Sequence, residues 1–346
     1  MKKKLFVFLR PLTGLAAAAL LLTACDPDKE NTGPSAPTNV VYVVNEGTTN
    51  AAVSLYNKAD KTVQRDLFAP ANSNVPLGPF LQNMAVVDDK GYLVMNGADK
   101  VEVVQMHNFQ RTATISGLQT PRYFTANGSS KAYVTEWQGA YPNYRAGRVS
   151  VVDLGSNTIS KRIGVRVNPE QMLLLNNKLY VTNSYSDSLA VINAGTDVLE
   201  SYIALPSGSK GIVRDAAGNI WVLCSEYGDP QDYLVRFNPA TPTQQVRIAF
   251  DNDYQNGNLR TNEAGNKIYV SLGSGTYELT PTATALPATP LIRRNFYGLG
   301  IDPTDNTIYG GTASFSGDAK VYRYTSTGAV IDSFRVGVAP NSFLFR

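Results

Sequence analysis

The sequence contains one histidine, His107, in 346 residues. Ser-His-Asp triads and most zinc sites need histidine at the reacting centre. His107 lies in "QMHNFQ", which has the pattern of a turn between two strands. The chain also lacks a P-loop and a dinucleotide-binding fingerprint. These absences argue against a histidine-dependent enzyme and against a P-loop or Rossmann-type nucleotide-binding protein.

The sequence has no apolar run long enough for a permanent transmembrane helix, which needs about 20 residues. Its apolar stretch, residues 11–24, follows Lys2, Lys3, Lys4 and Arg10. This order predicts a secretory signal peptide. The stretch "LTAC" at 22–25 resembles the lipobox of bacterial lipoproteins, so we expect residues 1–24 to be removed and Cys25 to carry lipid. The alternative is an ordinary cleavage site with a chance cysteine.

Residues 25–38 are polar and contain proline, which predicts a flexible tether between the lipid and a domain at 39–346. The acidic start of this stretch is similar to the surface-export signal of lipoproteins in some Gram-negative phyla. It favours a protein that is lipid-anchored to the outer membrane at the cell surface and contacts the membrane only through that lipid. An inner-membrane or periplasm-facing location is the alternative, because Asp26 follows the cysteine.

The chain has little excess charge once the signal peptide is removed. Residues 1–24 hold four basic and no acidic residues, so 27 basic and 28 acidic residues remain. A nucleic-acid partner would call for a basic patch, and this balance argues against one. With Cys25 acylated, Cys224 has no partner for a disulfide. It lies in "IWVLCSE", a strand pattern that predicts a small buried side chain.

The sequence is instead rich in short repeated strands. A shared four-residue pattern begins at seven places, spaced 40 to 51 residues apart: Tyr42, Leu93, Tyr133, Tyr180, Trp221, Tyr269 and Tyr309. Each is followed by two further alternating runs and by a fourth that often starts after proline or glycine. Four strands per unit of this length indicate a β-propeller. We therefore predict an all-β fold of seven blades with four antiparallel strands each.

The fourth run of each unit is best interpreted as the innermost strand of the next blade. The last such run, "NSFLF" at 341–345, has no later blade to enter. We expect it to pair with the strand that starts at Tyr42 and to close the ring, which removes free sheet edges.

The motifs "YVVN" and "YVTN", followed by "VSVVD"-like strands, resemble YVTN-type seven-bladed propellers of secreted and periplasmic proteins. The stretches "YVVNEG", "KVEVV", "SKAYVTEW" and "NSFLF" are most similar to surface lipoprotein propellers that capture cobalamin for an outer-membrane, TonB-dependent transporter. The resemblance implies cobalamin or a related corrinoid as ligand and that transporter as partner. It transfers no contact residues, because the motifs lie in strands, and a propeller fold by itself implies no function.

Strand order predicts which face each loop reaches. Short Asp-, Asn- and Gly-rich turns fall on the bottom, whereas long aromatic loops fall on the top, as a binding face requires. The longest, "WQGAYPNYRAG" at 137–147, contributes several candidates. The predicted rim of the ligand site is Trp137, Tyr141, Tyr144, Arg145, Tyr185, Tyr227, Tyr254 and Phe315. In the alternative interpretation, each aromatic ring packs only against its own loop.

Aligned starts of the inner strands predict a polar ring beneath this rim. Its members are Gln82, Arg122, Glu170, Lys210, Tyr297 and Asn341, of which Arg122, Lys210 and Tyr297 are the candidate ligand contacts. Such a ring could bind amides or phosphate while the rim covers a flat surface. Alternatively, Arg122, Glu170 and Lys210 form a solvated charge network.

Acidic residues also gather in the top loops: Glu136, Glu226, Asp229, Asp232, Asp251 and Asp253. "DNDYQNG" at 251–257 resembles the start of a calcium loop, but Asn262 stands where its bidentate glutamate belongs. We expect no catalytic residue, no resident metal and no cofactor, with calcium an open alternative. The leading hypothesis is a non-enzymatic binding protein. The alternatives are a lactonase-like hydrolase with a carboxylate-held metal, and a scaffold that binds a partner protein.

Overall fold

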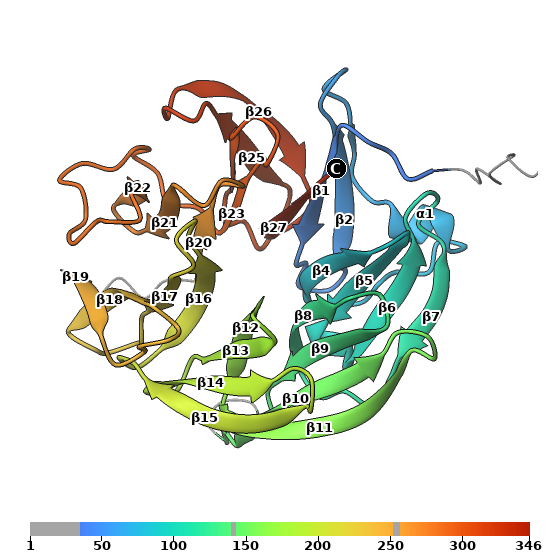
Figure 1. Ribbon diagram of the computed structural model, residues 1–346. Coiled ribbons are helices and arrows are strands. Elements are labelled where there is room, and N and C mark those ends of the chain that lie inside the picture. The colour runs from blue at the N-terminus through green and yellow to red at the C-terminus, as the bar shows by residue number, and fades with distance from the viewer. Residues whose placement is uncertain (1–34, 140–142, 252–256) are drawn as a thin grey trace, which may run out of the picture. The chain divides into compact units, whose positions relative to one another are not determined.

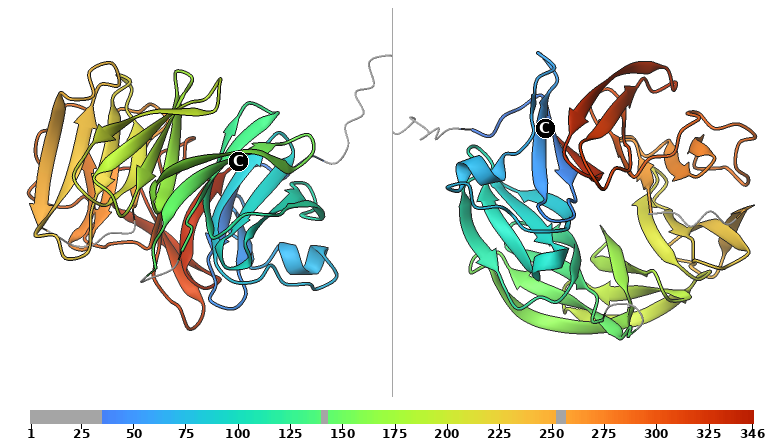
Figure 2. Two further views of the ribbon diagram at one scale, coloured as in Figure 1. Left: turned by 90° about the horizontal axis from the view of Figure 1, so that it is seen from below. Right: turned by 180° about the vertical axis from the view of Figure 1, so that it is seen from behind.

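Seven antiparallel sheets stand side by side in a ring in the computed structural model, which describes residues 35–139, 143–251 and 257–346 (Figure 1). Ser35–Arg346 form one unit, which Figure 2 shows from two other sides. The fold is the seven-bladed β-propeller that the repeat predicts. The expected signal peptide, Cys25 and tether residues 25–34 lie outside the described residues.

The blades are numbered in chain order, with the strands of each given from the axis outward. Blade 1 consists of β27 (Pro340–Phe345), β1 (Val40–Asn45), β2 (Ala52–Asn57) and β3 (Val63–Gln64). Blade 2 consists of β4 (Leu81–Val87), β5 (Lys90–Met95), β6 (Lys100–Gln105) and β7 (Arg111–Ile115). Blade 3 consists of β8 (Pro121–Asn127), β9 (Lys131–Glu136), β10 (Ala146–Asp153) and β11 (Thr158–Val167). Blade 4 consists of β12 (Pro169–Leu175), β13 (Lys178–Asn183), β14 (Ser188–Asn193) and β15 (Val198–Ala204).

The remaining blades follow the same order. Blade 5 consists of β16 (Ser209–Arg214), β17 (Ile220–Cys224), β18 (Gln231–Phe237) and β19 (Gln245–Asp251). Blade 6 consists of β20 (Leu259–Thr261), β21 (Ile268–Leu272) and β22 (Gly275–Leu279). Blade 7 consists of β23 (Gly298–Ile301), β24 (Ile308–Gly311), β25 (Ala319–Tyr324) and β26 (Val330–Val336). Among the described residues, the short helix α1 (Phe68–Ala71) lies in the connection from blade 1 to blade 2, and the 3₁₀ turn η1 (Asn96–Ala98) joins β5 to β6 within blade 2.

The outer edge of blade 6 departs from the four-stranded plan. After β22, the chain returns along that strand only as an isolated bridge between Thr276 and Ile292. Residues 281–290 between these two elements contain three prolines. Proline has no N–H to donate to a strand ladder, which accounts for the single bridge in place of a regular fourth strand.

The C-terminal strand closes the ring, as predicted. β27 pairs antiparallel with β1, with Leu344 opposite Tyr42 and Phe343 opposite Val43. In Figure 1 the red end of the chain therefore lies beside the blue strand β1. The salt bridge between Lys58 and Asp302, 2.9 Å long, adds a second link between blades 1 and 7. The first and last blades are thus joined by a sheet as well as by side chains.

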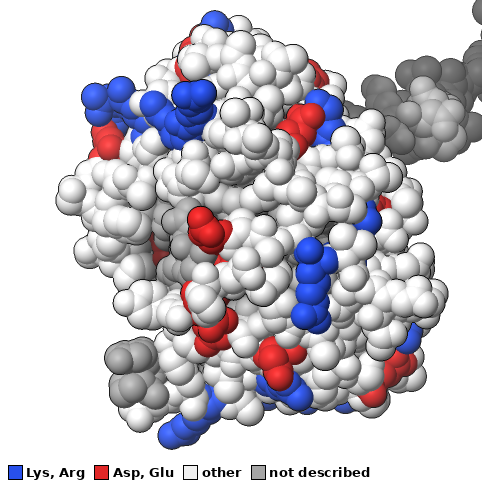
Figure 3. All heavy atoms as spheres, turned by 90° about the vertical axis from the view of Figure 1, so that its left-hand side faces the viewer, with Lys and Arg blue, Asp and Glu red and all other residues white. Residues whose placement is uncertain are grey.

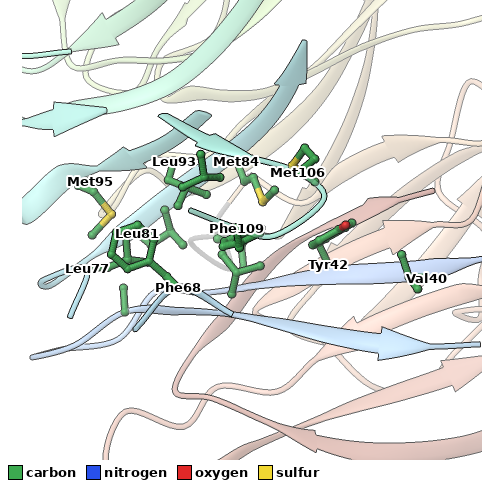
Figure 4. Close-up of a cluster of buried hydrophobic side chains, with 14 residues drawn as sticks. Val40, Tyr42, Phe68, Leu77, Leu81, Met84, Leu93, Met95, Met106 and Phe109 are labelled. Atoms are coloured by element: carbon green, nitrogen blue, oxygen red, sulfur yellow. The ribbon is translucent and has the colours of Figure 1, made fainter. Parts of the chain in front are cut away.

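The hydrophobic core is divided among the interfaces between blades. In the described part of the chain, each of seven buried clusters joins residues of two adjacent blades. Figure 4 shows the cluster between blades 1 and 2, where Tyr42, Met84, Leu93 and Phe109 lie together. Alternate side chains of a strand face opposite sides. Val43 therefore packs toward blade 7, which explains why β1 is buried on both faces.

The register corrects one detail of the predicted repeat. The sequence pattern places the start of the blade 2 motif at Leu93. The strand pairing instead makes Tyr92 the equivalent of the other motif aromatics, because Tyr92 lies opposite Ala85 of the inner strand. Tyr133 holds the same place opposite Thr125 in blade 3. The adjacent aromatic and aliphatic residues of "GYLVMN" fit the pattern in two frames, and only the strand pairing separates them.

The predicted bottom turns have the expected backbone. Their Asp and Asn residues adopt positive φ, which these residue types tolerate better than most: Asp88, Asn176, Asn177 and Asn306.

Cys224 is 1% exposed, as predicted for a small buried side chain. No helix among the described residues is long and apolar enough to cross a membrane. On the side drawn in Figure 3, basic and acidic residues are dispersed over a mostly uncharged surface.

Candidate functional site

A β-bulge recurs where the innermost strand of a blade begins. In blades 1 to 5 the ladder between the inner strand and its neighbour skips at this point. A bulge leaves a residue outside the ladder and redirects its side chain. The skipped positions include five of the six residues of the predicted polar ring: Gln82, Arg122, Glu170, Lys210 and Asn341. The sixth, Tyr297, directly precedes β23.

In blades 3 and 4 the threonine hydroxyl of the "YVTN"-like motif contacts the bulge. The Thr135 hydroxyl accepts a hydrogen bond from the Tyr123 N–H and donates one to the Glu170 carbonyl of the next blade, 2.9 Å away. Thr182 repeats the pattern one blade later by donating to the carbonyls of Gln171 and Lys210. These two hydroxyls thus link the bulges of blades 3, 4 and 5. Blades 1, 2 and 5 have Val44, Val94 and Leu223 at the equivalent position, so they lack this link.

The bulges surround a cavity of about 330 Å³ at the top of the channel. "Top" denotes the face at which the innermost strands begin. The cavity wall is mainly polar and comes from six blades. It is formed by Glu46, Gln82, Asn83, Arg122, Tyr123, Phe124, Thr125, Gln171, Met172, Asn258, Arg260, Tyr297, Asn341 and Ser342.

Arg122 is the best-connected cation of this cavity. Its Nε and Nη2 donate to the Glu170 carboxylate at 3.1 and 3.3 Å, and its Nη1 donates to Gln82 Oε1 at 2.5 Å. Its guanidinium carbon lies 4.3 Å from the centre of the Trp137 ring. Trp137, half-buried in the loop between β9 and β10, therefore covers one face of a cation that Glu170 holds in place.

Burial and neighbouring charges shift the pKa values of Glu170 and Lys210. Burial raises the pKa of Glu170, and the nearby Arg122 and Lys210 oppose that rise. Burial lowers the pKa of Lys210 to about 8, against the opposing charges of Glu170, Asp232 and Glu226. The Lys210 ammonium group is therefore charged at neutral pH and loses its proton as the pH rises through about 8.

A second aromatic pair stands at the same cavity on blade 7. The Tyr297 hydroxyl donates to Glu46, and the pKa of Tyr297 is raised by burial and by that carboxylate. The Tyr297 ring meets the edge of Phe315 with 5.3 Å between centroids. Phe315 is 53% exposed, so an apolar surface here faces solvent beside the polar cavity.

A third aromatic pair borders a separate hollow on blades 3 to 5. The rings of Tyr144 and Tyr185 lie 4.6 Å apart. Tyr185 also lines a depression of about 570 Å³ together with Arg166, Asp187 and Glu226. This depression shares no wall residue with the cavity at Arg122, so the predicted rim divides between two places.

The structure thus brings together only part of the predicted site. Arg122 and Tyr297 line the upper cavity, where Trp137 stacks on Arg122 and Phe315 contacts Tyr297. Lys210 lies outside its wall, close enough to Glu170 to influence the pKa of that carboxyl. Tyr144 and Tyr185 belong to the other depression. Tyr227 is 81% exposed and Arg145 is exposed, and neither lines either hollow. Tyr141, Tyr254 and Asp253 lie outside the described residues.

Two of the acidic residues predicted for the top loops, Glu136 and Asp232, are buried beside basic side chains. Glu136 is fully buried, binds the Arg148 guanidinium and accepts from Ser150. Asp232 is also buried and lies close enough to influence Lys210. In the ranges that the structure describes, no three His, Cys, Asp or Glu side chains are grouped to hold a metal ion.

Sequence reasoning missed several wall residues of the cavity, among them Glu46, Tyr123, Gln171, Asn258 and Arg260. Tyr123 and Gln171 follow Arg122 and Glu170 directly. A regular strand would turn them away from the channel, whereas a two-residue bulge lets both members face it. The sequence pattern does not show where the bulge lies, so it could not predict that Tyr123 and Gln171 face the channel.

Comparison with solved structures shows the fold at low sequence identity. A quinonprotein alcohol dehydrogenase-like protein of Bacteroides thetaiotaomicron is 16% identical, with a TM-score of 0.68 over 89% of this chain and 78% of that chain. A functionally unknown protein of Desulfotomaculum acetoxidans is 10% identical, with a TM-score of 0.67 over 89% and 98%. A protein of Bacteroides fragilis described as a candidate 6-phosphogluconolactonase is 13% identical, with a TM-score of 0.60 over 91% and 100%.

No curated protein matches the sequence. A family model does, over residues 39–336, and this range spans nearly the whole ring. The chain is therefore a member of the family described as "Domain of unknown function (DUF5074)".

Proposed function

We propose that this propeller is a binding protein whose ligand sits on the upper cavity, and that the ligand is cobalamin or a related corrinoid. The observation that carries the proposal is the series of bulges, which brings the amides of Gln82, Gln171 and Asn341 and the guanidinium of Arg122 from four blades to the wall of one cavity. A corrinoid is a flat ring edged with amides and joined to a phosphate. Such a ligand can lie across the mouth while its polar groups reach downward.

The aromatic residues beside the cavity fit the flat part of this ligand. Trp137 stands on blade 3 and the Tyr297–Phe315 pair on blade 7, with the polar wall between them. Aromatic side chains offer broad apolar area at little entropic cost, and the amides below can donate to or accept from ligand amides. At about 330 Å³, the cavity is small for a whole corrinoid, so the ring of the ligand would rest on the aromatic mouth.

We further propose the cellular setting that the sequence predicts. Cys25 would anchor the propeller to the outer membrane, and residues 25–38 would let it reach a TonB-dependent transporter that receives the ligand. A rigid ring on a flexible tether suits capture followed by transfer, because the tether raises the local concentration at the transporter.

The test is a calorimetric titration of the protein with cyanocobalamin. Saturable heat with a stoichiometry near one supports the proposal, and no heat at micromolar concentrations contradicts it. The same preparation is assayed for calcium-dependent hydrolysis of a lactone. Hydrolysis without cobalamin binding would instead favour a lactonase-like enzyme, the activity suggested for the Bacteroides fragilis protein of similar fold.

A further inference from the structure

One residue breaks the sevenfold pattern at the second level of the channel. This level consists of the seven inner-strand residues that pair with the Tyr or Trp at the start of each blade's motif. In six blades it is uncharged: Leu344, Ala85, Thr125, Leu173, Val213 and Gly300. In blade 6 it is Arg260, opposite Tyr269. A charge at a level that packing fills with small or apolar groups elsewhere calls for its own explanation.

The surroundings of Arg260 hold its guanidinium without neutralising it. Its Nε donates to the Leu299 carbonyl at 2.9 Å, and an Nη donates to the Leu259 carbonyl at 2.8 Å. Among the described residues, no carboxylate lies within ion-pair distance of it. Glu263, the acidic residue nearest to it in the sequence, is exposed. Arg122, by contrast, is paired with Glu170.

Arg260 is half-buried, and even partial burial without a counter-ion is costly for a guanidinium, which cannot shed its proton at neutral pH. Burial does lower the pKa of Arg260, and the main nearby titratable group is the phenol of Tyr123. Burial raises the pKa of Tyr123, so this phenol stays neutral near pH 7 and supplies no negative charge. The site therefore carries a positive charge that an anion would balance.

Space for an anion lies on both sides of Arg260. The residue lines the upper cavity together with Tyr123, Gln171 and Asn258. It also lines a second cavity of about 660 Å³ toward the bottom face. The wall of that cavity combines apolar residues such as Leu173 and Phe343 with the carboxylates of Asp215 and Glu263. The upper cavity offers the amides of Gln171 and Asn258 as further donors beside Arg260, and its carboxylate, Glu46, accepts a hydrogen bond from Tyr297. The two carboxylates of the lower wall disfavour an anion there.

We propose that Arg260 anchors an oxyanion-binding site in the middle of the propeller, which takes the phosphate or carboxylate group of a small molecule in the upper cavity. Arginine suits this role because its planar fork can bind two oxygens of one oxyanion while other nitrogens keep their structural bonds. The site does not depend on the corrinoid proposal, since any small molecule with such a group qualifies.

The experiment titrates the protein with inorganic phosphate and, separately, with acetate, at an ionic strength held constant with chloride. Nitrogen-15 NMR follows the Nε–Hε signals of the arginines. The Nε–H of Arg260 donates to a backbone carbonyl, which slows its exchange with water. Its signal is the one missing from the spectrum of Arg260→Lys, a variant that keeps the positive charge. Arg247, exposed and bonded to Gln245, gives the matched control Arg247→Lys.

We expect a saturable shift of the Arg260 signal and a melting temperature that rises with the anion. In Arg260→Lys, affinity should fall at least about tenfold because the two-oxygen contact is lost. Arg247→Lys should bind like the unaltered protein. A response to phosphate alone assigns a phosphate site, and a response to both assigns a general oxyanion site. An Arg260 signal that stays fixed with both anions, or moves only in parallel with that of Arg247, overturns the proposal. Cobalamin is absent from this titration, so its outcome is separate from that of the proposed function.

Discussion

The Arg122 guanidinium lies between the ring of Trp137 and the carboxylate of Glu170, and it reaches Glu170 from the neighbouring blade. Both partners of the ion pair stand at β-bulges at the start of an inner strand. The same geometry that links blades 3 and 4 therefore shapes the wall of the upper cavity. Stability and binding can be separated by changing one partner at a time.

Replacing Glu170 with Gln should leave Arg122 largely buried without its carboxylate. The side chains of Arg122 and Glu170 are 16% and 9% exposed, so little water can compensate. We expect a loss of about 3 kcal/mol in the free energy of unfolding, measured by urea denaturation. The control is Asp318→Asn, which removes the partner of Arg65 in a pair with side chains 53% and 39% exposed. That change should cost less than about 1 kcal/mol. Equal losses in the two variants would contradict the role given to the buried pair.

The Thr135 hydroxyl should be needed for the bulge of blade 3. Thr135→Val keeps the shape but leaves the Tyr123 N–H and the Glu170 carbonyl without this partner. We expect a loss of roughly 1–3 kcal/mol in the free energy of unfolding, together with weaker ligand binding. Thr158→Val removes a hydroxyl from an exposed pair with Ser156 and should change stability by no more than about 0.5 kcal/mol. A Thr135→Val protein as stable as the unaltered one would show that the motif hydroxyl does not hold the bulge.

The stability of the protein should depend on pH through Lys210. Its pKa is lowered from 10.5 to about 8, so between these values the unfolded chain binds a proton that the folded protein does not. The free energy of unfolding therefore rises as pH increases from about 8 toward 10, and this contribution is lost as pH falls back to 8. The check compares urea midpoints across this range in the unaltered protein and in Lys210→Met. The slope should be shallower in the variant, and identical slopes would remove Lys210 as the cause.

Closure of the ring should make the C-terminus indispensable. Deleting residues 340–346 removes β27, the inner strand of blade 1, and exposes the edge of β1. We expect a protein that aggregates or melts far below the full-length chain in calorimetry. Removing Arg346 alone should have a much smaller effect, since it takes away only the backbone pairing with Val40 and leaves β27 in place. A deletion variant that melts like the full-length protein would contradict closure by this strand.

The lipid anchor can be tested without reference to the ligand. Cys25→Ser should abolish incorporation of labelled palmitate and release the protein from the membrane fraction, because the thiol is the predicted acylation site. Cys224→Ser alters the other cysteine, which is buried, and should leave labelling unchanged. Labelling that persists in Cys25→Ser would refute the lipobox interpretation.

Much of the fold could be predicted from the sequence because the blade is a local unit repeated seven times. The aromatic residue of each motif is buried between blades, so its spacing reports the blade length. Blade 2 was misaligned by one residue because Tyr92 and Leu93 are both suitable, and strand pairing alone decides between them.

The site was less predictable, for a physical reason. Aligned strand starts identified Arg122 and Glu170, but whether the following residue also faces the channel depends on a bulge. Tyr123 was missed on that account. Arg260 was missed differently: its signal was a charge among uncharged equivalents, visible only after the second level of every inner strand had been aligned. Loop aromatics such as Tyr144 and Tyr185 were placed on the correct face, yet they pack against each other away from the cavity.

The central claim is that a ligand binds where Trp137 covers Arg122, and a comparison of two alanine variants in the cyanocobalamin titration tests it most directly. Trp137→Ala removes a ring at the upper cavity. Tyr202→Ala removes a ring that is likewise stacked under an arginine, Arg166 at 4.6 Å, but on the outer strand β15. We predict that Trp137→Ala weakens binding by roughly 1–3 kcal/mol, whereas Tyr202→Ala leaves the affinity unchanged. Equal affinity of the unaltered protein and Trp137→Ala would contradict the account.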